Sequence, residues 1–310
     1  MILFAGIPSE PPLRMAIDAA ERLGSPYLVF NQRQSAFVDL EMAFDDTGLA
    51  GSIWIGDTRY PFDAFTGIYA RPVEAAVLPE TQSRRTAGPD PATLARTQAL
   101  TDLFNDFLDV ADMRVVNRPS AMGSNLSKPF QAQLIQAAGL LTPDTLVTNC
   151  PDAVREFHTQ QGRIVYKSIS AVRSIVKEWT PATGPDLAAV TQLPTQFQAF
   201  VPGVNIRVHV VGSTLFATEI VSNAIDYRYG ERDGFGTAMK PIELPSRVAE
   251  ACVRLTAELD LCLSGIDLKR TPNGDWYCFE VNPSPAYSFF EEHAGQPIAE
   301  TLVRLLAGEI

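Results

Sequence analysis

Three residues with oxygen-bearing side chains stand on two predicted strands near the end of the chain. Residues 264–269 and 276–281 each read as a strand, and the Asn-Gly turn between them predicts a β-hairpin. This hairpin brings Asp267 next to Glu280, and Asn282 follows two residues later on the same face. Two carboxylates and an amide are oxygen ligands that suit Mg²⁺, so the hairpin predicts a magnesium site; solvated polar groups are the alternative.

Two lysines earlier in the chain could meet phosphate oxygens. Lys128 begins a predicted helix at 128–138, and Lys167 lies in a predicted strand at 164–168. An ammonium group at such a place can neutralise phosphate as a point charge. A solvated surface position is the alternative for each lysine.

An alternating strand after the Pro-Gly turn at 202–203 separates polar from apolar side chains. Asn205, Arg207 and His209 share one face, and the apolar residues between them share the other. We expect one face to join the core and the polar face to line a cleft. The guanidinium of Arg207 fits phosphate or carboxylate at two points, while a salt bridge at the rim is the alternative.

Composition excludes several classes of partner. The chain has 310 residues, 46% of them hydrophobic, and a net charge of −11, enough apolar content for a large core in two or three domains. An acidic chain without a basic run predicts no nucleic-acid partner. No segment has the length and apolarity to span a bilayer, and residues 1–7 lack the basic start of a signal peptide. We therefore expect a cytoplasmic protein with no membrane partner.

The cysteines and histidines argue against zinc and thiol chemistry. Cys150, Cys252, Cys262 and Cys278 show no C-x-x-C spacing, and the chain has only three histidines. We expect reduced and mostly buried cysteines.

The elements that would position these residues follow an α/β order. Apolar patterning predicts a strand at 2–6, a helix at 12–23 and a strand at 27–30. A hairpin at 49–60, a strand at 64–69 and a long helix at 91–111 complete a first domain. Further along the chain, we expect a loop at 120–125 and a helix at 298–306 that packs over the last sheet.

The order of these motifs resembles the ATP-grasp superfamily, in its RimK-like branch. The resemblance rests on the two lysines, the Phe-Gln-Ala-Phe-Val-Pro-Gly run at 197–203, the Asn-x-Arg at 205–207, and the Gly-Ile-Asp-Leu and Phe-Glu-Val-Asn-Pro runs. It covers about residues 115–310. It implies an α/β protein with an ATP-grasp fold, in which two α+β subdomains hold ATP behind a pre-ATP-grasp α/β domain. The implied domains are residues 1–114, 115–197 and 198–310, the last with the metal site.

The resemblance also implies a role for each candidate residue. The phosphates of ATP would be contacted by Lys128 and Lys167. Adenine would be held, partly through backbone groups, by the hinge residues Gln198, Ala199, Phe200 and Val201. Arg207 would face the γ-phosphate or an acyl phosphate. The ligands of Mg²⁺, with Mn²⁺ as an alternative occupant, would be Asp267, Glu280 and Asn282.

The family reaction transfers the γ-phosphate to a carboxylate, and an amine, or sometimes a hydroxyl or thiol, then attacks the acyl phosphate. Asp226-Tyr227-Arg228 resembles the Asp-x-Arg motif of the graspetide ligases, where the arginine meets the substrate carboxylate, so Arg228 is a catalytic candidate. Two departures leave the acceptor open. The loop at 168–174 lacks the glycines of many relatives, and the run after Pro283 lacks the Gly-Gln-Trp-like continuation of the graspetide ligases.

Three functions follow as hypotheses. The first is an ADP-forming carboxylate–amine ligase that acts on a small amino acid or a peptide. The second is a macrocyclase that forms ω-ester or ω-amide links on a ribosomal precursor peptide. The third is a nucleotide-binding protein without catalysis, which the retained metal ligands argue against. The sequence is compatible with a homodimer but does not specify the oligomeric state.

Overall fold

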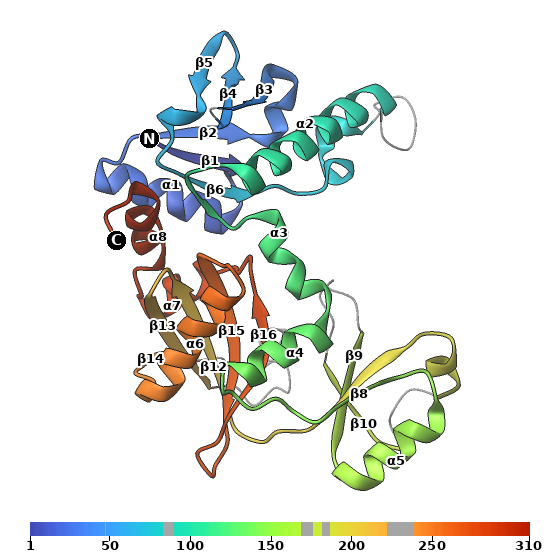
Figure 1. The fold of residues 1–310 in the computed structure, drawn as a ribbon. Helices are drawn as coiled ribbons and strands as arrows, with labels where there is room; N and C mark the ends of the chain where they lie inside the picture. The colour runs from blue at the N-terminus through green and yellow to red at the C-terminus, as the bar shows by residue number, and fades with distance from the viewer. Residues whose placement is uncertain (47, 83–89, 169–175, 182–186, 222–237) are drawn as a thin grey trace.

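The computed structural model describes residues 1–46, 48–82, 90–168, 176–181, 187–221 and 238–310. Figure 1 shows an N-terminal domain above two further bodies, one built around a five-stranded sheet and one around a four-stranded sheet. None of the helices in the described ranges combines the length and apolarity that a bilayer crossing requires.

The N-terminal domain is built on a parallel sheet with strand order β2-β1-β6-β7. Its strands are β1 (Ile2–Gly6), β2 (Tyr27–Asn31), β6 (Gly67–Arg71) and β7 (Arg114–Val116). The crossover helices are α1 (Pro11–Leu23) and α2 (Pro91–Val110), each with Pro at its start and an acidic cap. The strand, helix, strand order predicted from the sequence is therefore present.

A second, antiparallel sheet extends this domain. Its strands are β3 (Val38–Asp45), β4 (Gly48–Ile55) and β5 (Thr58–Pro61). The sequence predicted only the β4–β5 hairpin. Strand β3 was missed although Val38, Leu40, Met42 and Phe44 alternate with other residues, which is the pattern of a half-buried strand. The predicted strand at 64–69 lies instead at Gly67–Arg71, because Phe62–Ala64 forms a 3₁₀ turn.

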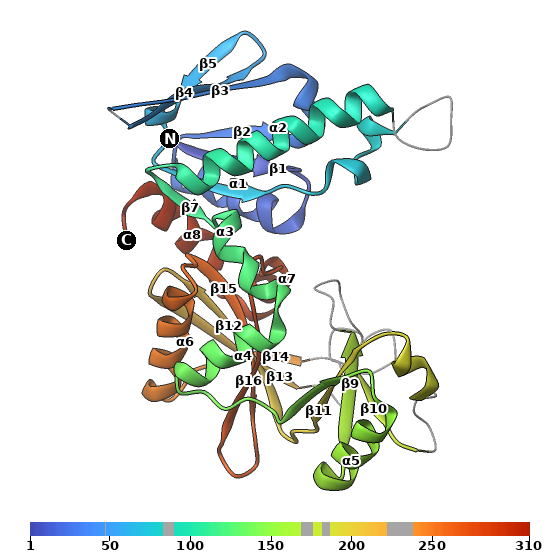
Figure 2. The ribbon, with the colours of Figure 1, turned by 45° about the vertical axis from the view of Figure 1, so that its right-hand side comes forward.

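The middle of the chain forms a small antiparallel sheet with order β10-β9-β11-β8. Its strands are β8 (Thr145–Thr148), β9 (Ile164–Ser168), β10 (Lys177–Trp179) and β11 (Thr195–Ala199). Helix α5 (Pro151–Gln161) covers one face, where Val154, Ile164 and Phe197 form a separate core. Figure 2 shows this body beside the five-stranded sheet.

The five-stranded antiparallel sheet has order β14-β13-β12-β15-β16. Its strands are β12 (Val204–Val211), β13 (Thr214–Val221), β14 (Ala238–Ile242), β15 (Leu263–Arg270) and β16 (Trp276–Asn282). Helices α4 (Lys128–Ala137) and α6 (Ser246–Glu258) contribute to the core on one face. Helix α4 thus packs on this sheet although it lies in the range 115–197; the predicted domain boundaries stay a proposal.

Residues 120–125, expected to be a loop, form the end of α3 (Pro119–Met122) and a 3₁₀ turn (Gly123–Leu126) instead. The helical start is explained by Pro119, since proline is favourable at the first helical position. Other 3₁₀ turns span Gln32–Phe37, Ala75–Val77, Pro79–Thr81 and Leu187–Thr191.

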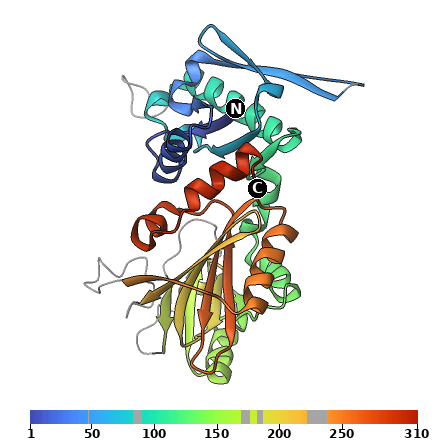
Figure 3. The same ribbon diagram turned by 90° about the vertical axis from the view of Figure 1, so that its left-hand side faces the viewer.

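The last helices return to the N-terminal domain. Helix α7 (Ser288–Ala294) is followed by α8 (Ile298–Ala307), whose apolar face includes Leu302 and Leu306. This face shares a core with α1 and β1 as well as with Val211 of β12. Figure 3 shows α8, in dark red, between the N-terminal domain and the five-stranded sheet. The helix therefore packs against the last sheet, as expected, and also against the N-terminal domain, which the sequence did not predict.

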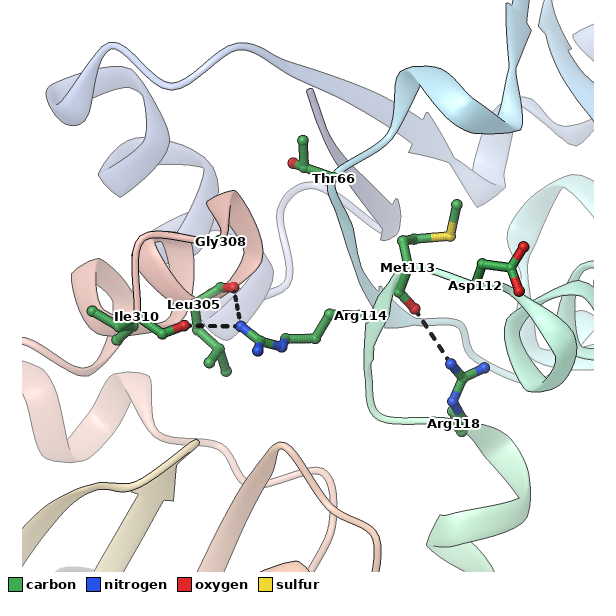
Figure 4. Close-up of a pocket in the computed structure, with 8 residues that line it drawn as sticks. All are labelled: Thr66, Asp112, Met113, Arg114, Arg118, Leu305, Gly308 and Ile310. Atoms are coloured by element: carbon green, nitrogen blue, oxygen red, sulfur yellow. Dashed lines mark hydrogen bonds between the residues drawn. The ribbon is translucent and has the colours of Figure 1, made fainter.

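Two arginines bind main-chain carbonyls where the N-terminal domain meets the rest of the chain. Arg118 donates to four main-chain carbonyls around the end of α2, where helix carbonyls lack internal donors. Arg114 donates to the carbonyl of Leu305 at 2.6 Å. Both line an open pocket of about 480 Å³ (Figure 4), and none of the predicted site residues lines it.

Candidate active site

A row of charged side chains crosses three neighbouring strands of the five-stranded sheet. Arg207 on β12 is the register partner of Asp267 on β15, and Asp267 is the register partner of Glu280 on β16. All three lie on the face opposite the core that contains α6, because Ile206, Val208 and Ile266 occupy that core. The hairpin pattern had predicted that the two acidic residues lie on adjacent strands.

Each acidic residue in the row pairs with a cation. Arg207 donates from Nη1 to Asp267 Oδ1 at 2.8 Å, and Lys128 Nζ lies 3.4 Å from Glu280 Oε2. The carboxylates keep more surface than the cations do, with 32% of the Asp267 side chain and 28% of the Glu280 side chain exposed. The two carboxylates can therefore be reached by a ligand while the cations behind them hold their orientation. Arg207 is therefore paired with Asp267, which the sequence predicted to be a metal ligand.

A β-bulge explains how β16 presents its polar residues. The register shifts between Asp267 and Leu268, so that Glu280 pairs with Asp267 while Cys278 pairs with Leu268. Phe279 is the extra residue of the bulge. The bulge lets Cys278 and Val281 face the core while Glu280 and Asn282 face the site.

Asn282 and Gly265 occupy the next row of the same face. They are register partners, and Asn282 Oδ1 accepts a hydrogen bond from the backbone of Ser284 at 2.9 Å. A side chain at Gly265 would overlap the guanidinium of Arg207 and the ring of Pro285. The glycine of the Gly-Ile-Asp-Leu run therefore makes room for Arg207, a role that its sequence position alone did not reveal.

His209 does not line a polar cleft as the alternation predicted. It is fully buried, and its ring centre lies 5.0 Å from that of Phe290. Its Nε2 accepts a long hydrogen bond from Arg207 Nε at 3.4 Å. Burial, with Arg207 beside it, lowers the pKa of His209 well below its ordinary value. The prediction failed because α7, which carries Phe290, covers this end of the sheet and was not evident from the sequence.

Two buried amide side chains hold the ends of β15 and β16 in place. Gln131 of α4 donates to the carbonyl of Val281 and accepts from its N–H, both at 2.8 Å. Asn117 binds four main-chain groups, including the carbonyls of Leu263 and Pro283. The sequence analysis did not identify either residue. Asn117 follows two valines, but Gln131 is one of three glutamines on α4, so its sequence position did not set it apart.

The four-stranded sheet carries the remaining lysine and the hinge. Lys167 on β9 and Gln198 on β11 are each 7% exposed, on the face opposite the α5 core. Gln198 donates to Thr145 Oγ1 at 3.0 Å, and the backbone of Ala199 and Phe200 is fixed by Asp144 and Arg163. The residues just before β8 and β9 thus hold the backbone of the predicted hinge in place.

Lys269 joins this hinge to the five-stranded sheet. Its Nζ donates to the carbonyl of Val201 at 3.1 Å and lies 5.4 Å and 5.5 Å from the ring centres of Phe200 and Phe279. These distances suit cation–π contacts on both rings. Burial, and then the charge of Arg163, lowers the pKa of Lys269. No sequence motif pointed to Lys269, because its partners lie far away along the chain.

Several predicted features fall outside the described residues. Arg228 and its Asp-x-Arg motif lie in the range 222–237, and most of the loop at 168–174 lies in the range 169–175. Within the described ranges, no three His, Cys, Asp or Glu side chains gather as a metal site. The predicted site differs in type, since it combines two carboxylates with one amide.

The residues fit the ligands that the sequence predicted. Asp267 and Glu280 are adjacent, partly exposed oxygen donors, which is the donor set that Mg²⁺ requires. For a nucleotide, the hinge residue Val201 is only 7% exposed, and its carbonyl is held by Lys269. A backbone N–H at the hinge is a donor of the kind that a purine ring nitrogen accepts from.

Comparison with known proteins gives a family match over the second half of the chain. The family model for the RimK-like ATP-grasp domain matches residues 144–306. Over 97 residues the chain is 31% identical to the glutathione synthetase of Yersinia pestis, a segment that spans 29% of this chain and 29% of that protein.

Solved structures match nearly the whole chain. The ATP-grasp ligase PsnB complexed with its minimal precursor is 25% identical, with a TM-score of 0.78 over 99% of this chain and 98% of PsnB. A second PsnB structure contains a phosphomimetic precursor variant, Mg and ADP. The macrocyclase MdnC of Microcystis aeruginosa MRC, bound with precursor peptide MdnA, is 19% identical with a TM-score of 0.80 over 99% of both chains. The predicted α/β, ATP-grasp fold is confirmed.

Proposed function

We propose that this chain, which belongs to the RimK-like ATP-grasp family, is an ATP- and Mg²⁺-dependent ligase that activates a carboxylate as an acyl phosphate and joins it to an amine. The observation that carries the proposal is the row of Arg207, Asp267 and Glu280 with Lys128 beside it. The row brings accessible carboxylates for a divalent cation together with cations for phosphate on one face. The family match agrees with the ligase prediction made from the sequence.

In this proposal, Asp267, Glu280 and Asn282 hold Mg²⁺, and Lys128 and Lys167 hold phosphate oxygens. The metal supplies charge neutralisation where negative charge gathers on the transferred phosphoryl group. Arg207 fixes Asp267 in position at 2.8 Å. The bound partners would be ATP, the carboxylate donor and the amine, and the products would be ADP, phosphate and an amide.

No residue of the described site has to act as a nucleophile. The cysteines fit this view, since Cys252 and Cys278 are buried on the core side of the sheet. Positioning and electrostatic stabilisation account for most of the catalysis in phosphoryl transfer. The fixed hinge and the paired charges of the row supply both.

A peptide is the substrate class that the comparisons favour. The structure of PsnB, a ligase solved with a precursor peptide, matches 99% of the length of this chain, including the N-terminal domain. We therefore propose, as a second and narrower function, that the chain links side chains within one precursor peptide. Arg228 would then meet the substrate carboxylate.

The test is ADP release from MgATP with a panel of amino acids, peptides and precursor peptides, followed by mass spectrometry of the product. We expect one compound to stimulate ADP release and to lose one water per bond formed. Loss of water within a single peptide, with no added amine, would select the macrocyclase.

Asp267→Asn removes one charge from the row, and we expect it to abolish the stimulated release. The matched control is Asp260→Asn, an exposed residue whose positive φ of 56° suits asparagine. Equal ADP release by wild type and Asp267→Asn would refute the proposed site. ATP binding without stimulation by any compound would favour the nucleotide-binding protein.

A further inference from the structure

A buried glutamine on the four-stranded sheet has no role in the site described so far. Gln196 of β11 is 2% exposed, and its Oε1 has no hydrogen-bond donor among the described residues. An unpaired buried amide oxygen costs stability, so most such atoms have a partner. Gln32 of the N-terminal domain shows the ordinary case. Its Nε2 donates to the carbonyl of Val73, and its Oε1 accepts from the N–H of Val73. Gln196 Oε1 therefore calls for a donor beyond the described residues, and a bound ligand can supply one.

The register places Gln196 on the face that carries the predicted nucleotide residues. Phe197 points into the core with α5, so Gln196 and Gln198 lie on the opposite face. Gln196 is the direct register partner of Lys167 on β9. Side chains at such positions start about 5 Å apart. Gln196 thus stands beside one predicted ATP-contacting residue and two positions before the hinge.

The unpaired atom identifies the chemistry of its partner. Oε1 is an acceptor, so the partner must donate a hydrogen bond, and a phosphate oxygen cannot do so. The N6 amino group of adenine donates, and its neighbour N7 accepts. A glutamine amide matches this pair of atoms, as it does where proteins recognise adenine in nucleic acids. Guanine presents an acceptor, O6, in place of the amino group.

We propose that Gln196 reads the adenine base through its side-chain amide and sets the preference of the site for ATP over GTP. This inference rests on the proposed function, because it requires a nucleotide against the four-stranded sheet. It also gives a hydrogen-bond donor to the Oε1 atom, which has none among the described residues. Lys167 lies in the same cross-strand pair, so one pair of side chains meets both the base and the charge of the nucleotide.

Gln196→Met tests the inference, because methionine keeps the length of the side chain and removes the amide. The measurements are the Kd values of MgATP and MgGTP by calorimetry and the melting temperature without nucleotide. We expect the Kd for ATP to rise at least tenfold, because the hydrogen bonds of the amide to N6 and N7 are lost, and the Kd for GTP not to rise. The melting temperature should not fall, since an unpaired acceptor is removed.

The matched control is Gln32→Met, a buried glutamine bonded at both ends. It should lower the melting temperature and leave the ratio of the two Kd values unchanged. An unchanged ratio in Gln196→Met would overturn the inference, whether or not the melting temperature falls. If the wild type binds ATP and Gln196→Met keeps the ratio, only the inference fails. If the wild type binds neither nucleotide, the proposed function fails, and the inference fails with it.

Discussion

The side chain of Asn117 offers a direct measure of how the β15–β16 hairpin is held in place. Its side chain is 3% exposed and donates to the carbonyls of Leu263 and Pro283 at 2.7 and 2.6 Å. It also accepts from the N–H groups of Cys262 and Leu263 at 2.8 and 3.2 Å. One side chain thus connects the end of the N-terminal sheet to the start of β15 and to the residue after Asn282.

Asn117→Ala leaves four main-chain groups without this partner. At about 1 kcal/mol for each lost bond, the free energy of unfolding should fall by about 4 kcal/mol. Because Pro283 directly follows Asn282, the variant should also weaken the response of any nucleotide-dependent signal to Mg²⁺. The assay is urea unfolding followed by tryptophan fluorescence and circular dichroism, with the slope m compared between variants.

The control is Gln98→Ala on the exposed side of α2, where the glutamine side chain donates a hydrogen bond to Asp102. It should change the free energy of unfolding by less than about 0.5 kcal/mol. A loss of less than about 1 kcal/mol in Asn117→Ala, with an unchanged slope, would refute the reasoning. The four bonds would then contribute little to holding the strand.

Three further predictions follow from the geometry and the pKa shifts. Lys269→Met removes the hydrogen bond to the carbonyl of Val201 and should raise the KM for ATP severalfold with a smaller change in kcat. A fall in kcat as large as the rise in KM would contradict a positioning role. Burial lowers the pKa of His209 below 6.5, so the unfolded chain binds its proton more readily, and stability should fall below pH 6.5 by up to about 1.4 kcal/mol per pH unit. Thermal unfolding at several pH values should show that the stability of His209→Gln depends less on pH than that of the wild type. An equal pH dependence in the two proteins would exclude His209 as its cause. Burial raises the pKa of Cys252 to about 12 and that of Cys278 well above its usual range, so iodoacetamide should label exposed Cys150 first; early labelling of Cys278 would disprove its burial.

The sequence predicted the parts of the site that depend on local patterns. The Asn-Gly turn and two apolar runs determined the hairpin, and with it the pairing of Asp267 and Glu280. The alternation in β12 correctly separated Arg207 from the core residues Ile206 and Val208. These features depend on the strand period and on turn chemistry, which neighbouring residues encode.

Features that depend on distant segments were not predicted. The bulge at Phe279 depends on pairing between two strands, and no residue type in β16 marks it. The burial of His209 depends on α7, and the role of Gly265 depends on the size of a side chain on another strand. Lys269 meets the hinge only because the chain brings β15 and Val201 together. Such contacts are set by tertiary packing, which a single sequence does not display.

The measurement that tests the central claim most directly is the affinity for ATP with and without Mg²⁺, in the wild type and in Glu280→Gln. The matched control is Glu250→Gln, an exposed residue on α6. If Glu280 holds the metal beside Asp267, Mg²⁺ should strengthen ATP binding in the wild type and in the control but have little effect in Glu280→Gln. The same dependence on Mg²⁺ in all three proteins would contradict the assignment of the metal site.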